Sequence, residues 1–150
     1  MAVKRSDFPL PDLDDERTAG YFAGAARGEL VIPKCDACGR LCWYPEDRCP
    51  ACGGDAFTWT AVGGHGRVFT WAVVRRAFLP AFQEMVPFVT ALVALDEDPA
   101  VRIVTLLVDV DPAALTVDLP MEVVFRPLAF PTVPDRSVVV PMFRSAGDAP

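Results

Sequence analysis

Two copies of the short motif C-x-x-C-G constrain the fold of this chain more than any other feature. The first copy is Cys35-Asp36-Ala37-Cys38-Gly39 and the second is Cys49-Pro50-Ala51-Cys52-Gly53, with ten residues between Cys38 and Cys49. Each motif places two thiolates on one side of a tight turn, and its glycine accepts the positive φ that such a turn tends to need. Two knuckles facing each other supply four sulfurs in the tetrahedral arrangement that Zn²⁺ takes in structural sites.

Other uses of paired cysteines fit this pattern less well. A redox C-x-x-C motif needs one pair rather than two, and two disulfides would suit a secreted protein, which nothing here indicates. Rubredoxin-type iron uses the same knuckles, and zinc is favoured because nothing else in the chain indicates electron transfer. Because protein thiolates would fill all four positions, we expect Zn²⁺ on Cys35, Cys38, Cys49 and Cys52 to hold structure and not to bind substrate.

Composition favours a protein of the cytoplasm. The chain has 150 residues, enough for one domain or two small lobes, and 52% of them are hydrophobic. Its formal net charge is −6. No apolar run approaches the roughly 18 residues of a membrane span, and the first residues lack the apolar stretch of a signal peptide. Reduced thiols point the same way. We expect the fifth cysteine, Cys42, to be a buried apolar side chain, with a reactive thiol as the alternative.

Four segments are expected along the chain: an N-terminal helical segment (1–29), a zinc ribbon (30–57), an OB-fold barrel (58–143) and a flexible tail (144–150). Residues 1–11 are polar with two prolines and are expected to lack fixed structure. A helix is expected from Asp12 to Gly28, since acidic residues near its start suit a helix N-terminus.

The fold class is expected to be mainly β. Alternating or apolar runs separated by turn residues predict five strands after the ribbon, at residues 57–62, 67–74, 88–95, 101–108 and 122–127. With no long helix between them, these strands favour a small closed barrel of the OB type. Residues 138–140 are expected to dock as a tail strand, and residues 75–87 to form a long loop.

The charge of the expected barrel argues against a nucleic-acid-binding protein. From Thr58 to Phe130 there are five arginines, eight acidic residues and no lysine. Contacts between basic residues and phosphates supply most of the affinity of non-specific nucleic-acid binding, and this balance leaves few of them. Catalysis by this chain alone also lacks support, because the single histidine, His65, lies in a glycine-rich turn and no second histidine could activate a serine.

Four residues of the 75–87 loop are candidates for contact with a ligand or partner. Arg75 and Arg76 could meet an anionic ligand such as a CoA phosphate, or be two solvated arginines. Phe78 and Phe82 belong to an apolar set that forms either a partner-binding surface or a flap over the barrel. The sequence leaves both pairs of alternatives open.

Taken in order, a set of residues and motifs resembles a known family. They are Tyr21-Phe22, Gly28-Glu29-Leu30, the two knuckles with Pro45 between them, Trp59, Gly64-His65-Gly66-Arg67-Val68-Phe69-Thr70, Pro80-Ala81-Phe82, Pro87-Phe88-Val89, Leu95-Asp96-Glu97 and Val123. Over residues 12 to 143, this order resembles the acyl-CoA-associated zinc-ribbon/OB-fold family, long catalogued as a domain of unknown function. The chain departs from the family pattern at Asp98-Pro99 and at 118–121, which affects local turn geometry.

The resemblance implies a structural zinc on the four cysteines and an OB barrel that packs on a thiolase-like enzyme or lies near its CoA-thioester site. Members of the family accompany thiolase-like proteins, including retro-aldolases of steroid side-chain breakdown, and others partner acetyl-transfer or hydroxymethylglutaryl-CoA-forming enzymes. No catalytic residue of the family maps onto this chain.

We therefore expect a non-catalytic accessory subunit of an aldolase or acyltransferase complex, which binds a thiolase-like enzyme acting on a bulky acyl-CoA and helps to shape its CoA-thioester site. A hetero-oligomer is expected, without nucleic acid. Two alternatives stay open: a free-standing acyl-CoA-binding module, and an OB protein that binds single-stranded nucleic acid, whose binding would be sensitive to salt.

Overall fold

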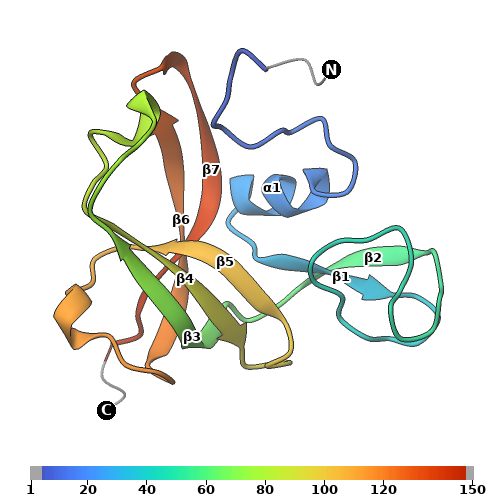
Figure 1. Ribbon diagram of the computed structural model, residues 1–150. Helices are drawn as coiled ribbons and strands as arrows, with labels where there is room; N and C mark the ends of the chain where they lie inside the picture. Colours follow the sequence, from blue (N-terminus) through green and yellow to red (C-terminus); the bar gives the residue numbers. More distant parts are fainter. Residues whose placement is uncertain (1–4, 148–150) are drawn as a thin grey trace.

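The computed structural model describes residues 5–147 and shows a mainly β protein with one helix (Figure 1). The elements in chain order are α1 (Ala19–Ala26), β1 (Val31–Cys35), β2 (Phe57–Ala61), β3 (His65–Val74), β4 (Phe88–Leu95), β5 (Arg102–Leu107), β6 (Pro120–Phe130) and β7 (Val133–Ser145). Two short 3-10 helices, Pro80–Phe82 and Pro112–Ala114, lie in the connections. Within the described residues, no helix has the length and apolarity needed to cross a membrane.

Five strands close into a barrel in the order β3-β4-β5-β7-β6, with β3 also pairing with β6. All pairings are antiparallel except a parallel contact between β5 and β7. β1 and β2 form a separate antiparallel pair, which belongs to the ribbon beside the barrel (Figure 1). The expected fold class, a zinc ribbon with a five-stranded OB barrel, is confirmed.

The membership of the barrel differs from the expectation in one strand. The segment expected as the first barrel strand, 57–62, pairs instead with β1, from Cys35 opposite Phe57 to Val31 opposite Ala61. The fifth barrel strand is β7, of which the expected tail strand 138–140 is only the middle. Two prolines and a charged pair inside β7 are unusual for a barrel strand and hide it from an analysis of strand propensity.

The N-terminal segment is also organised differently from the expectation. The helix begins at Ala19 and not at Asp12. Side-chain oxygens of Asp12 and Asp15 accept hydrogen bonds from backbone N–H groups two residues later, both over 3.0 Å. Such local bonds compete with helix formation, so residues 12–18 form turns. Leu10 is 1% exposed, so the described part of 1–11 is held in place, contrary to expectation, while residues 1–4 lie outside the described residues.

One continuous core joins the helix and the first ribbon strand to the barrel. Val68, Ile103 and Phe143 of the barrel are fully buried, and Tyr21 of α1 and Ile32 of β1 belong to the same cluster. A second cluster lies between the β6–β7 hairpin, residues 81–85 and Leu10. β7 continues through Ser145, so the first two residues of the expected tail are in a strand, and residues 148–150 lie outside the described residues.

Candidate metal centre

The two knuckles adopt the same backbone conformation. In each, the glycine N–H donates to the carbonyl of the first cysteine over 2.8 Å, namely Gly39 to Cys35 and Gly53 to Cys49. The N–H of the first cysteine donates to the carbonyl five residues later, over 2.9 and 2.7 Å. Both glycines have positive φ, 75° and 78°, which residues with a Cβ adopt at a cost. The repeated C-x-x-C-G sequence therefore encodes the turn as well as the thiols.

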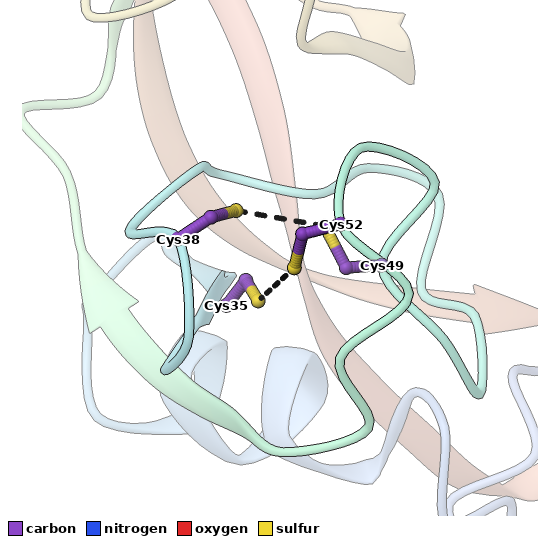
Figure 2. Close-up of side chains that lie close together, drawn as sticks. All are labelled: Cys35, Cys38, Cys49 and Cys52. Atoms are coloured by element: carbon purple, nitrogen blue, oxygen red, sulfur yellow. Dashed lines mark hydrogen bonds between the residues drawn. The ribbon is translucent and has the colours of Figure 1, made fainter.

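The four cysteine side chains point toward one another between the knuckles (Figure 2). Their sulfur atoms all lie within 4.8 Å of one another, with 3.6 Å between Cys35 and Cys52 and 3.7 Å between Cys38 and Cys49. Zinc–sulfur bonds of about 2.3 Å in a tetrahedron place sulfurs about 3.8 Å apart. The thiols are not joined as disulfides. The arrangement fits a structural zinc ion held by four thiolates.

Hydrogen bonds from backbone N–H groups favour the thiolate form that a metal needs. The backbone N–H of Cys52, together with that of Ala51, lowers the pKa of the Cys49 thiol to about 6, against the opposing effect of burial. The N–H of Gly54 also points at the sulfur of Cys52, over 3.4 Å, and lowers the pKa of that thiol. The neighbouring Cys35 thiol and burial act in the opposite direction and raise the pKa of Cys52 to about 12. Backbone donors aimed at ligand sulfurs stabilise negative charge and hold each ligand in position.

Cys42 lies beside the site without completing it. It is 5% exposed, and its sulfur is 3.8 Å from that of Cys49. Burial and the neighbouring Cys49 raise the pKa of the Cys42 thiol to about 11. A protonated, buried thiol is a poor nucleophile, so the expectation of a buried apolar Cys42 agrees with the structure.

The ribbon has almost no core apart from its ligands. Its buried cluster consists of Cys35, Cys42 and Cys49, with Phe57 packed against them. Leu41, Trp43 and Trp59 of the ribbon pack against the main core, and polar contacts such as the 2.6 Å hydrogen bond from the Thr58 hydroxyl to Asp36 add to these. Metal binding would therefore supply much of the folding free energy of this lobe, as in other small zinc modules.

The candidate residues of the 75–87 loop lie on the barrel, away from the cysteines (Figure 1). Phe82 is half-buried and makes an edge-to-face contact with Phe130 at 5.4 Å between ring centroids. Phe78 is 86% exposed, and Arg75 and Arg76 are exposed. Of the two readings of the loop, the inward one fits Phe82 and the outward one fits Phe78.

A second region, which the sequence did not reveal, lies where the helix, ribbon and barrel meet. A cavity of about 350 Å³ is lined there by Tyr21, Phe22, Trp43, Tyr44 and Val104, among others. Tyr44 is 60% exposed, and burial raises the pKa of the Tyr21 phenol above its usual value. The aromatic pair Trp43-Tyr44 was a visible signal, but nothing in the sequence placed Val104 of β5 beside it.

Two protein-family models match consecutive parts of this arrangement, from residue 22 to residue 126. Residues 22–58 match the model of the ChsH2 rubredoxin-like zinc ribbon domain, and residues 59–126 match that of the ChsH2 C-terminal OB-fold domain. A solved chain described as "Ltp2-ChsH2(DUF35) aldolase" superposes with a TM-score of 0.75 and 30% sequence identity, over 90% of this chain and 98% of that one. A DUF35 family protein from Sulfolobus solfataricus, 12% identical over 73% of this chain and 78% of its own, shares the fold with a TM-score of 0.54.

Two curated relatives are similar in sequence. A "Probable enoyl-CoA hydratase alpha subunit" of Thermomonospora curvata is 33% identical over 92% of this chain, which spans 40% of that relative's length. A "DUF35 domain-containing scaffold protein" of Pyrococcus furiosus is 33% identical over 65% of this chain and 68% of its own. Together with the two family models, these relatives show that the chain belongs to the ChsH2/DUF35 family, in which a rubredoxin-like zinc ribbon is joined to an OB-fold barrel.

Proposed function

We propose that this chain is a non-catalytic accessory subunit of a cytoplasmic acyl-CoA-processing complex, in which a thiolase-like enzyme supplies the catalytic groups. The reaction of that enzyme is a retro-aldol or thiolytic cleavage of a bulky acyl-CoA, such as a steroid side-chain thioester. The chain stabilises the enzyme and helps to shape the entrance to its CoA-thioester site.

The structural similarity to the Ltp2-ChsH2(DUF35) aldolase carries this proposal. It extends over almost all of both chains, and the description of that structure names two components of one aldolase. The name of the Pyrococcus furiosus relative, a scaffold protein, supports a role in assembly. The name of the Thermomonospora curvata relative, an enoyl-CoA hydratase subunit, supports a CoA thioester as the substrate class.

The chemistry of the chain supports a role without catalysis of its own. A metal bound by four thiolates has no open position for substrate or water. The single histidine, His65, is exposed and lies opposite Glu122 in the sheet, but the Glu122 carboxylate accepts a 2.8 Å hydrogen bond from Arg144. Within residues 5–147, no hydrogen bond joins the His65 side chain to a carboxylate that would orient it as a general base, which supports the proposal.

The test is recovery of the tagged chain from its native cell, with mass spectrometry of the proteins that copurify. The proposal expects a thiolase-like protein in stoichiometric amount, and it expects the purified pair to cleave an acyl-CoA faster than the enzyme alone. An enzyme that is fully soluble and fully active without this chain would refute the proposal.

A second candidate function is a free-standing acyl-CoA-binding module. It is favoured by a cavity of about 240 Å³ in which Arg76 borders apolar residues that include Phe78 and Phe88. Calorimetric titration of the isolated chain with an acyl-CoA distinguishes the two functions, because only the module binds the thioester without a partner.

A further inference from the structure

The outer surface of the three strands β3, β4 and β5 is unusually apolar for a barrel exposed to water. Along β4, the residues that point into the core are buried, as in Val93 at 0% exposed. The alternate residues, which point outward, are Phe88, Thr90, Leu92 and Ala94. An antiparallel strand with one wet face normally alternates apolar and polar residues. Here both faces of the strand lack charge.

The register of the strands aligns these outward residues into rows. One row runs from Thr70 through Leu92 to Val104. The next rows run from Ala72 through Thr90 to Leu106, and from Val74 to Phe88. Leu106 and Phe88 are half-buried, because Leu106 packs against the second cluster and Phe88 against Phe82. We call these three rows, together with the adjoining Phe78, the β3–β5 face. Val104 is 71% exposed and Phe78 is 86% exposed, so large apolar side chains stand free at two points of the face.

Shallow cavities follow the same face. One of about 270 Å³ lies over the row that contains Leu92 and Val104. Val104 also lines the cavity of about 350 Å³ beside Tyr44. Val74 and Phe88 line the cavity of about 240 Å³ beside Phe78. The hollows thus continue from the ribbon across the sheet to the 75–87 loop. Large apolar patches of this kind mark sites of contact with other molecules.

Charge is distributed along this face in an uneven way. The whole chain has 20 acidic residues, but β3, β4 and β5 contain none. Arg67 and Arg102 flank Ala94 in the row at one end of the face, and Arg75 and Arg76 follow β3 at the other end.

Within residues 5–147, none of these four arginines forms an ion pair with a carboxylate. The carboxylates of the acidic turn 96–98 are among those that they do not pair with. Arg67 donates to a backbone carbonyl, and Arg102 stacks over Phe69 with 3.9 Å between its guanidinium carbon and the ring centroid. The face thus has an apolar centre and arginines at both ends, and at the Arg67/Arg102 end the acidic turn 96–98 lies next to them.

We propose that the β3–β5 face is the docking surface for the enzyme subunit, and that the enzyme meets it with an apolar patch bordered by carboxylates at both ends. This inference rests on the proposed function and adds the location and the chemistry of the contact. Exposed aromatic and aliphatic side chains in the centre would supply most of the affinity, whereas the arginines would set orientation and the rate of association.

A second copy of this chain is the alternative occupant. In a two-fold symmetric contact each patch meets itself, so Arg75 and Arg76 would face the end that carries Arg67, Arg102 and the acidic turn 96–98. The enzyme is favoured because Arg75 and Arg76 form no ion pair within residues 5–147, and carboxylates on an enzyme would pair with them.

The test measures the Kd between the purified chain and the thiolase-like protein recovered with it, by biolayer interferometry at low and high salt. Val104→Asp puts a charge on the exposed apolar side chain at the β5 edge of the face, and the double variant Arg75→Glu/Arg76→Glu reverses the charge at one end. Val117→Asp and Arg40→Glu are the matched controls. Val117 is 62% exposed in the β5–β6 connection, and Arg40 is exposed in the ribbon. Zinc content and the thermal midpoint verify that each variant is folded.

We expect Val104→Asp to weaken binding by about tenfold or more, because it would bury a charge in an apolar part of the contact. The double arginine variant should weaken binding about tenfold at low salt, mainly through slower association, and less at high salt, whereas the controls stay within about threefold. If Val104→Asp does not fold, the double variant decides the question, because both arginines are exposed.

The other outcomes count against the inference in distinguishable ways. If both face variants bind the enzyme as tightly as the unaltered chain, the docking surface lies elsewhere and only this inference fails. If the unaltered chain does not bind the enzyme, the proposed function fails with it. If sedimentation shows that the chain alone forms a dimer and that Val104→Asp dissociates it, the face serves self-association and the inference is wrong.

Discussion

Removal of one metal ligand should separate the folding of the ribbon from that of the barrel. The apparent binding free energy of a structural zinc is about 10–16 kcal/mol, so each of four thiolates contributes about 3 kcal/mol. We therefore expect Cys49→Ser to weaken zinc binding by at least about a hundredfold. Because the buried cluster of the ribbon consists of cysteines and Phe57, the main apolar contacts left to hold residues 36–56 are those of Leu41 and Trp43 with the main core.

Cys42→Ala is the matched control for this prediction. Its sulfur lies 3.8 Å from that of Cys49 and is as well buried, but it is not part of the tetrahedral set. Loss of this thiol removes a small buried group and should cost about 1 kcal/mol without changing the ligand count.

The assay combines competition for zinc against a chromophoric chelator with hydrogen exchange followed by mass spectrometry. Cys49→Ser should lose zinc and exchange rapidly in the ribbon, while β4 and β5 stay protected by the barrel core. Cys42→Ala should keep one zinc and native exchange. The four-thiolate assignment would be refuted if Cys49→Ser kept zinc at native affinity, or if Cys42→Ala lost it as readily.

Three further predictions follow from the barrel. Phe143→Ala should lower the free energy of unfolding in urea by about 3–5 kcal/mol, since Phe143 is 0% exposed. Gly64→Ala should cost about 1–3 kcal/mol more than Gly28→Ala, because both have φ near +78° but only at Gly64 would a Cβ meet Val123, at 2.3 Å; urea unfolding again measures the difference. Arg126 donates a hydrogen bond to the Asp109 carboxylate and holds the pKa of that carboxyl below its usual range. The ion pair therefore contributes stability at neutral pH that is lost as pH falls through the lowered pKa. Arg126→Gln should raise the pKa of Asp109, as measured by a carboxyl NMR titration.

The metal centre could be predicted from the sequence because its geometry is local. Each C-x-x-C-G motif fixes its own turn through the hydrogen bond from glycine to the first cysteine. The ten-residue spacer then needs only to bring two prefolded knuckles together. No information about distant strands enters, and the same reasoning explains why the buried, non-ligand role of Cys42 could also be anticipated.

The assignment of residues 57–62 to the barrel was wrong because strand propensity does not say which strand a segment pairs with. The segment around Trp59 has good strand propensity, but it pairs with β1 and not with a barrel strand. Gly20 of α1 lies against the ring of Trp59, where a Cβ would come within 2.2 Å of the ring atoms. This close approach of helix and strand depends on the folded ribbon, and glycine propensity alone gives no sign of it.

The roles of the two phenylalanines in the 75–87 loop could not be separated by sequence for a related reason. An irregular loop has no period that assigns side chains to faces, so Phe78 and Phe82 appear alike. The structure distinguishes them because Phe82 packs on Phe130, which lies far along the chain at the end of β6. Within residues 5–147, Phe78 has no aromatic neighbour of this kind, and it is 86% exposed.

The β3–β5 face could not be recognised from the pattern of apolar residues in the strands alone. Strand patterns are used to assign one face to the core, and strands that are apolar on both faces usually lie between two layers. In this barrel the core covers Val93 and Ile103 on the inner side, while Leu92 and Val104 have no comparable layer outside. An apolar outer face with unpaired arginines at both ends is expected of a subunit whose second layer comes from another protein. The pattern that made the strands easy to find therefore also favours an accessory role.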